Sequence, residues 1–378
     1  MGGYLLAGRR WVNLVALAAA LLGALAAAHV ARETWWHPMV VVPAPEIATR
    51  PAGEAPTLLF LGDTAPTDAA TEALRARGWD YPFARTAPIV RAADLAVANF
   101  ESSIAAADVP FGVWKRYRYR AEPDALAAIA RAGIDALGLA NNHAMDCGAR
   151  GLRETLGHAA RGGLATFGAG RDAAEARRGL VVRLGGVRVG LLGWLEPGFV
   201  DAVWSRAFAR EGRPGVARLS ERDVRADVAR MRRHADVVIA SVHWGENYQA
   251  VTGGQRRFAR VLAAAGVDLV VGHHPHVAQP LAMIDRTVVA YIIGNYGFGT
   301  SGRRALRAGL MLGATLRDRR LVRVALVPID VQNRRVRFQP RVLRGDAARR
   351  VLEPLARASR AQGAELRVEG DEAVLDLR

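Results

Sequence analysis

Short apolar runs that each lead directly into metal-binding side chains are the feature that most limits how this chain of 378 residues can fold. The side chains that follow these runs are Asp63, Glu101, Asn142, His243 and the segment Gly272-His273-His274-Pro275-His276. Apolar runs of this length, separated by helical segments, predict buried strands of an α/β fold. Such sheets assemble their sites at the carboxyl ends of the strands, so we expect one shared site.

The triple-histidine segment follows the apolar run at 267–271, which predicts a strand ending in a turn. Neutral imidazole is the commonest protein ligand for a transition metal, and a strand-end turn can hold several in fixed positions. The alternative is a turn that is rich in histidine by chance. Because only nine histidines occur in the whole chain, we favour metal binding.

The candidate ligands mix oxygen and nitrogen donors, which suits one or two ions of manganese, zinc or iron better than calcium. Two such ions about 3.5 to 4 Å apart would lower the pKa of a shared water and promote in-line displacement at phosphorus. His143, next to Asn142, would then be free to protonate the leaving group. For Asp63 alone, a helix cap or turn former is the competing interpretation.

The formal net charge of +16 comes almost entirely from arginine, because Lys115 is the sole lysine. No nucleic-acid-binding motif accompanies the charge, so nucleic acid is not expected as a partner, whereas an anionic polymer or lipid is compatible with it. Cations and aromatics alternate over residues 114–120. This segment is predicted to form either an edge strand or one side of a site that binds an anionic ligand. Cys147, the only cysteine, is expected to be buried and inert.

The amino terminus predicts export. Arg9 and Arg10 precede twenty uncharged residues at 11–30, long enough to span a hydrocarbon core of about 30 Å. We prefer an uncleaved anchor, with signal cleavage near Ala26-Ala27-Ala28 as the alternative. Either way the body is exported, to the periplasm or the cell exterior. The predicted divisions are an anchor or signal segment at 1–31, a linker at 32–56, a domain at 57–345, and a C-terminal helix and tail at 346–378.

Local patterns predict further elements. Gly185-Gly186 between apolar runs predicts a hairpin, and Ser220 is expected to cap a helix. Antiparallel strands are expected near residues 309–316, 321–329 and 336–343. The segment at 196–214 has no clear period and is either a lid or a substrate-facing insertion.

The ordered motifs resemble the CapA-type poly-γ-glutamate capsule biosynthesis proteins, within the calcineurin-like metallophosphatase superfamily. The motifs that carry the resemblance are Gly62-Asp63, Asn99-Phe100-Glu101-Ser102, Asn141-Asn142-His143-Ala144, His243-Trp244-Gly245, Gly272-His273-His274-Pro275-His276-Val277 and Gly294-Asn295. The resemblance covers roughly residues 57–299. It implies a four-layer α-β-β-α sandwich behind a single membrane anchor.

Residue by residue, the resemblance implies a set of metal ligands and one acid. The implied ligands are Asp63, Asn142, His243, His274 and His276, with Glu101 in the place of the bridging acid and His143 in the place of the proton donor. His273 could exchange roles with His274. Three departures stand out. The broader phosphatase pattern has an imidazole where this chain has Ala65, and its second motif normally carries Asp where this chain has Asn99 and Glu101. The capsule proteins usually have Glu where this chain has Asn247, and its Glu246 is displaced by one position.

Two functions are therefore expected in different classes. The first is a membrane-anchored, exported, metal-dependent hydrolase of the phosphoesterase type, acting in capsule or surface-polymer synthesis. The second is a non-catalytic factor that holds an anionic polymer during assembly or export. Both imply an anionic polymer or phosphoester as ligand, the membrane as support, and a polymer synthase or export complex as partner.

Overall fold

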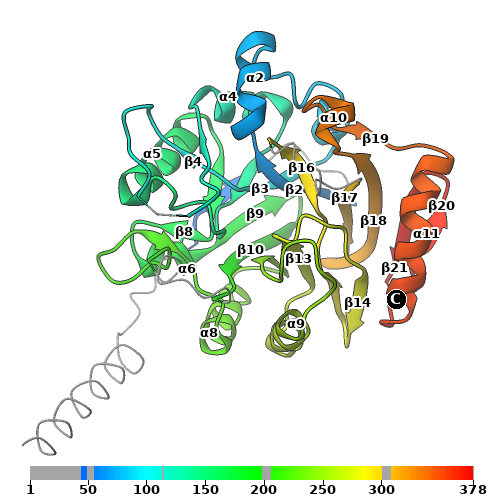
Figure 1. Cartoon of the computed structure of the whole chain (residues 1–378). Coiled ribbons are helices and arrows are strands. Elements are labelled where there is room, and N and C mark those ends of the chain that lie inside the picture. Colours follow the sequence, from blue (N-terminus) through cyan, green and yellow to red (C-terminus); the bar gives the residue numbers. More distant parts are fainter. Residues whose placement is uncertain (1–43, 49–54, 113–114, 198–205, 300–307, 378) are drawn as a thin grey trace, which may run out of the picture. The chain divides into compact units, whose positions relative to one another are not determined.

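The computed structural model describes residues 44–48, 55–112, 115–197, 206–299 and 308–377. They form a domain of two β-sheets with helices packed on them (Figure 1), which confirms the predicted α/β class. The predicted anchor at 11–30 lies outside the described residues. Within the described ranges, no helix has both the length and the hydropathy that crossing a bilayer requires.

The larger sheet has ten strands, and β2, β3, β6 and β7 run parallel in it. In order across the sheet its strands are β20 (Arg367–Glu369), β21 (Glu372–Asp376), β18 (Arg320–Asp330), β17 (Gly309–Arg317), β2 (Thr57–Ala65), β3 (Leu95–Phe100), β6 (Ala136–Gly138) and β7 (Ala165–Phe167). Two short strands extend it, β16 (Asn295–Phe298) beside β2 and β19 (Arg341–Val342) beside β18.

The smaller sheet has seven strands, and β10, β12, β13 and β15 run parallel in it. Its order is β1 (Glu46–Ala48), β9 (Leu180–Leu184), β10 (Val187–Leu195), β12 (Val237–His243), β13 (Leu269–His273), β15 (Thr287–Ala290) and β14 (Leu281–Ile284). The predicted Gly-Gly hairpin is confirmed, since β9 and β10 pair antiparallel and Gly185 has φ +57°. Strand β1 falls within the predicted linker and pairs with β9.

Two further strand pairs lie outside the main sheets: β4 (Ser103–Ile104) with β5 (Arg120–Ala121), and β8 (Ala169–Gly170) with β11 (Gly215–Val216).

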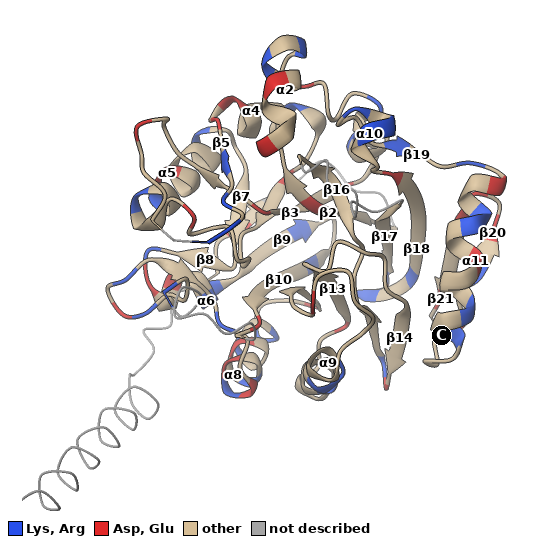
Figure 2. Ribbon diagram, in the orientation of Figure 1, with Lys and Arg blue, Asp and Glu red and all other residues tan. Residues whose placement is uncertain are grey.

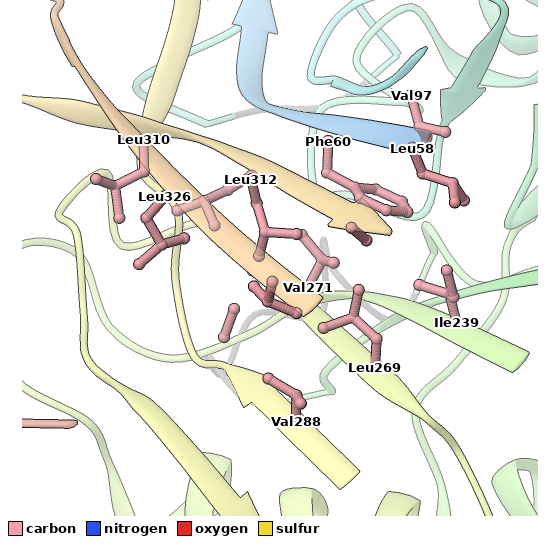
Figure 3. Packing of buried hydrophobic residues seen from close by; sticks show 14 of the residues in the cluster. Leu58, Phe60, Val97, Ile239, Leu269, Val271, Val288, Leu310, Leu312 and Leu326 are labelled. Atoms are coloured by element: carbon pink, nitrogen blue, oxygen red, sulfur yellow. The ribbon is translucent and has the colours of Figure 1, made fainter. Parts of the chain in front are cut away.

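Strand β2 is buried on both faces, and its side chains alternate between two cores. Leu58 and Phe60 point into the core between the two sheets, whereas Leu59 and Leu61 point into the core beneath the helices of the larger sheet. Side chains of a strand alternate with period two, so a strand covered on both faces becomes continuously apolar. Figure 3 shows the inter-sheet packing, which includes Leu58, Phe60 and Val97 from one sheet and Ile239, Leu269 and Val271 from the other.

The helices cover the outer faces of both sheets (Figure 1). Helices α3 (Ala87–Ala92), α4 (Asp124–Ala132) and α5 (Gly148–Arg161) share a core with the larger sheet, and α6 (Ala173–Arg178), α8 (Glu221–Met231) and α9 (Gly253–Ala265) with the smaller one. The remaining helices are η1 (Asp68–Ala70), α2 (Thr71–Arg77), α10 (Asn333–Val336) and α11 (Asp346–Arg360). The predicted cap of α8 is confirmed, since the Ser220 side chain accepts the N–H of Asp223.

Near the carboxyl terminus the structure departs from the sequence analysis. The strand predicted at 336–343 is wrong, because α10 ends at Val336 and only Arg341–Val342 form a strand. Arg337 and Phe338 have positive φ, and Pro340 lacks an N–H, so a longer strand cannot form. The tail contains the β20–β21 hairpin, and β21 extends the larger sheet by pairing with β18. The division at residue 345 stays a prediction.

We expect the C-terminal helix to be needed for stability, because Leu352 of α11 is fully buried in the inter-sheet core. Leu352→Ala should lower the free energy of unfolding by about 2 to 5 kcal/mol, through lost burial and the cavity left behind. Glu353→Ala, on the exposed face of the same helix, should change it by less than about 0.5 kcal/mol. Urea denaturation of both variants measures this, and equal effects would show that α11 is not part of the core.

Candidate metal centre

The predicted site residues meet where the parallel strands of both sheets end. The larger sheet contributes Asp63 on β2 and Glu101 directly after β3. The smaller sheet contributes His243 and His273, the last residues of β12 and β13. Candidate ligands separated by about two hundred positions in sequence are therefore neighbours in space, as the strand-end pattern predicts.

Asp63 is positioned by a close backbone contact that requires the preceding glycine. A Cβ on Gly62 would lie 1.9 Å from the carbonyl oxygen of Gly294, so only glycine fits there. The same carbonyl accepts the N–H of Asp63 at 3.0 Å. The carboxylate is then oriented by Asn99, whose Nδ2 donates to Asp63 Oδ1 at 2.8 Å.

Three imidazoles and one amide lie around the two carboxylates. His243 Nε2 is 2.8 Å from Asn142 Oδ1 and 3.1 Å from His274 Nδ1. His276 Nδ1 is 3.2 Å from Asp63 Oδ2 and 2.8 Å from Asn295 Oδ1. Their donor atoms therefore converge on the space beside Asp63 and Glu101.

The histidine turn has a strained backbone. His274 has φ +103° and His276 has φ +56°, values that residues with a side chain rarely adopt. The turn also needs Gly272, because a Cβ there would lie 1.7 Å from the carbonyl oxygen of Tyr291. Backbone strain of this kind is concentrated at functional sites, where it fixes the direction of side chains.

Glu101 provides the strongest indication that the centre accommodates a cation. Its side chain is fully buried, and neither carboxylate oxygen has a hydrogen-bond partner among the described residues. Burial, and then the negative charge of Asp63, raise the pKa of Glu101 well above its usual range. A buried carboxylate in these surroundings is costly unless a positive charge balances it.

Two groups of potential ligands share Glu101. One consists of Glu101, His243 and His274, and the other of Asp63, Glu101 and His276. Within each group, one ligand atom per residue lies within 4.8 Å of the others. The residues thus fit one or two cations, with Glu101 common to both groups.

The protonation states also suit metal binding. Burial, and then the neighbouring His276, lower the pKa of His274 to about 3, and burial followed by His274 lowers that of His243 well below its usual range. Burial alone would raise the pKa of Asp63, but His273 and His276 outweigh it and keep that pKa well below its usual value. Neutral imidazoles and an ionised carboxylate are the forms that bind transition metals.

His143 lies beside the cluster and belongs to neither group. Its Nε2 is 3.9 Å from Glu101 Oε1, and its Nδ1 is 2.7 Å from Asp146 Oδ2. Burial, followed by the charge of Lys115, lowers its pKa to about 4. Nε2 thus faces the cluster while Nδ1 contacts Asp146 on the opposite side of the ring. This arrangement is suited to proton transfer.

The structure also bears on two open points of the sequence analysis. His274 joins a group of potential ligands, whereas His273 Nδ1 lies 3.3 Å from Asp63 Oδ1 and joins neither group. Ala65, which replaces the imidazole of the broader pattern, packs in an apolar cluster with Tyr119 and Phe298.

Sequence reasoning did not assign roles to three residues that support the site. Lys115 and Tyr119 contact His143, and Asn295 contacts His276. Lys115 carried a signal, because it is the sole lysine in an arginine-rich chain. Tyr119 and Asn295 were visible only as parts of longer motifs, since their contacts join distant segments.

Comparison with known proteins places this geometry in a family context. Residues 57–300 match the family model described as bacterial capsule synthesis protein PGA_cap. The chain is 29% identical over 274 residues to the PGA biosynthesis protein CapA of Bacillus subtilis (strain 168), covering 72% of this chain and 70% of that protein. It is 28% identical over 283 residues to the capsule biosynthesis protein CapA of Bacillus anthracis, with 73% and 67% covered. A probable polyglutamine synthesis accessory protein of Mycobacterium tuberculosis is 32% identical over 278 residues, with 68% and 72% covered.

Glu101→Gln should have opposite effects on metal binding and on the stability of the metal-free protein. Removing the charge relieves its unfavourable burial beside Asp63, so the melting temperature of the chelator-treated protein should rise. The same change removes the ligand common to both groups, so bound metal should fall by about tenfold or more. Elemental analysis and thermal unfolding measure the two effects. Glu196→Gln, a buried glutamate that accepts the N–H of Gly245, is the control and should leave metal content unchanged.

Cys147 should react slowly with thiol reagents in the folded protein. The residue is buried, and burial raises its pKa to about 11, so little thiolate exists at pH 8. Alkylation by iodoacetamide at pH 8 should be at least about 100-fold slower than in the urea-unfolded chain, where the pKa returns to about 8.5. Because the chain has one cysteine, mass spectrometry gives the rate directly. Equal rates in the folded and unfolded protein would contradict the buried position.

Proposed function

The chain belongs to the PGA_cap family of bacterial capsule synthesis proteins, and from this premise we propose that it is a metal-dependent hydrolase in surface-polymer biosynthesis. The polymer is of the poly-γ-glutamate type; in support, the Bacillus subtilis relative is named a PGA biosynthesis protein and the Bacillus anthracis relative a capsule biosynthesis protein. The bond that it cleaves is a phosphoester or a related bond. The protein is held at the cell membrane by its N-terminal segment, with the domain exported.

The observation that carries this proposal is the state of Glu101. A fully buried carboxylate without a hydrogen-bond partner among the described residues, shared by two groups of histidine and carboxylate donors, fits a cation and is otherwise destabilising. Asp63, Glu101, Asn142, His243, His274 and His276 would hold one or two ions of manganese, zinc or iron. Such ions, when bound, supply a nucleophilic hydroxide at neutral pH and stabilise charge on phosphoryl oxygens.

The remaining chemistry is assigned to His143. Asp146 holds Nδ1 of the ring at 2.7 Å, which leaves Nε2 directed toward the side of Glu101. From that position Nε2 can deliver a proton to the oxygen that leaves the substrate. The low pKa of His143 in this structure is that of the ring without an anionic substrate, whose charge would favour the protonated form.

The arrangement of layers supports assignment to the metallophosphatase-like fold. Two sheets pack face to face, and each carries helices on its outer face, as a four-layer α-β-β-α sandwich requires. Metal-dependent phosphoester hydrolysis is the chemistry that this resemblance implies.

A second function is favoured by a different observation. Arg116, Tyr117 and Arg118 are exposed on the segment that leads into β5, which is blue in Figure 2. Arg116 lies 5.4 Å from the centre of the Tyr117 ring, and Arg118 lies 4.7 Å from that of Phe111. Exposed cations stacked on aromatic rings suit an anionic polymer, as expected of a non-catalytic assembly or export factor.

His143→Ala distinguishes the two functions. In a hydrolase the variant should lose about 10²- to 10⁴-fold in turnover of an aryl phosphate while keeping its metal, because it removes only the proton donor. It should also fail to restore surface polymer in a deletion strain. His234→Ala, an exposed histidine after α8, is the control and should behave like the wild type.

A His143→Ala protein that restored normal amounts of surface polymer would contradict the hydrolase and favour the polymer-holding factor. Elemental analysis of the same preparation ensures that loss of metal does not explain a loss of turnover.

A further inference from the structure

Lys115 lies at the site, largely shielded from solvent, in a chain that otherwise uses arginine for its basic side chains. Its side chain is 14% exposed, and Nζ lies 2.6 Å from Asp146 Oδ1. Nζ also donates to the carbonyl oxygen of Asn142 at 2.7 Å and lies 3.1 Å from His143 Nδ1. One ammonium group therefore contacts both ends of the turn at 142–146, which carries a candidate ligand and the candidate proton donor.

The segment that contains Lys115 holds His143 at a second point. The backbone N–H of Tyr119 donates to Asp146 Oδ2 at 2.6 Å, and the Tyr119 ring stacks on His143 with 4.1 Å between ring centres. From the other side, Ser103 Oγ donates to the carbonyl oxygens of His143 and Ala144 at 3.1 and 3.0 Å. Backbone and ring of His143 are thus fixed by separate contacts.

The use of lysine here has a physical reason. An ammonium group is compact and has three donors that point in different directions, whereas a guanidinium is a flat fork that favours one planar partner. The two acceptors of Lys115 are the Asp146 carboxylate and the backbone carbonyl of Asn142, and the ammonium group also lies against the His143 ring. An arginine, the basic residue used elsewhere in the chain, cannot make these contacts from the same position.

We propose that Lys115 is a positioning residue: it holds Asp146 and the Asn142–His143 backbone so that His143 Nε2 faces Glu101. This inference rests on the proposed function, because it gives His143 the role of proton donor. Lys115 does not contact the space between the ligand groups directly. It acts through Asp146, whose two oxygens are divided between Lys115 and His143.

The test uses the full chain, purified in detergent, with Lys115→Met. Turnover of an aryl phosphate should fall by about 100-fold, as expected for a misplaced catalytic group, while KM and metal content stay close to the wild type. Long-range proton–nitrogen NMR with ¹⁵N-labelled histidine should show a shift of the His143 ring nitrogens, assigned by their loss in His143→Ala. Lys115→Arg should recover less than about a tenth of the lost turnover, because charge alone does not restore the geometry.

Arg230→Met is the matched control. Arg230 is also a buried cation, 10% exposed, and its Nη1 donates to the buried Asp227 at 2.8 Å on α8. Its replacement removes one cation from Asp227, which keeps Arg177. Lys115→Met likewise leaves Asp146 with His143 and the N–H of Tyr119, so both variants should be destabilised. Below its melting temperature, Arg230→Met should keep wild-type turnover and unchanged His143 signals. A purely structural role of Lys115 would make the two variants alike.

Three results would overturn the inference. The first is Lys115→Met with wild-type turnover and unshifted His143 signals, and the second is a loss of metal that accounts for the lost turnover. If the Lys115→Met protein does not fold, a double variant with Lys115→Met and Asp146→Asn is tested instead, because it removes both charges of the ion pair. This double variant should show the same low turnover and shifted His143 signals, and wild-type values for both would be the third result. Absence of hydrolysis by the wild type would instead refute the proposed function, and the NMR signals would still test the positioning.

Discussion

The packing of two sheets against one another is the constraint on which the candidate site depends. Strands β2 and β3 present Leu58, Phe60 and Val97 to the inter-sheet core, and β12 and β13 present residues such as Ile239 to the same core. Because the parallel strands of both sheets end at the same side of this core, Asp63 and Glu101 from one sheet meet His243 and the histidine turn from the other. Loss of this packing would separate the two halves of the site.

The site stores unfavourable free energy that a cation would offset. Glu101 is buried next to Asp63, and His274 and His276 have positive φ. Each feature destabilises the folded protein when considered alone. Their concentration at one point, supported by glycines that no larger residue could replace, is typical of a site that evolution has retained for function rather than for stability.

The environment of His143 differs from that of the candidate ligand histidines. His243 and His274 face other donors of the cluster. His143 instead has Asp146 and Lys115 near its Nδ1, on the side away from the cluster, and the ring of Tyr119 stacked on its own ring. The ring of Tyr119 also packs with Ala65, the residue that stands where the broader phosphatase pattern has an imidazole. One side of the site is therefore apolar, and the segment at 115–119 provides both this apolar contact and the ion pair that holds His143.

The sequence by itself determined the class of fold and the identity of the candidate ligands. Apolar runs followed by Asp63, Glu101, His243 and the histidine turn are local patterns, because period-two burial and strand-end chemistry are set within a few residues. Hairpin and cap signals at Gly185-Gly186 and Ser220 were local in the same way, and the structure confirms both.

Only the tertiary structure decided which groups meet. It selected His274 over His273 as a member of a ligand group, placed Glu101 in both groups, and brought Lys115 to Asp146. It also showed that the C-terminal tail adds strands to the larger sheet. These outcomes depend on the register and packing of segments far apart in the chain. Such relations leave no periodic or compositional signal in a single sequence, because the energy that fixes them arises only when the sheets pack together.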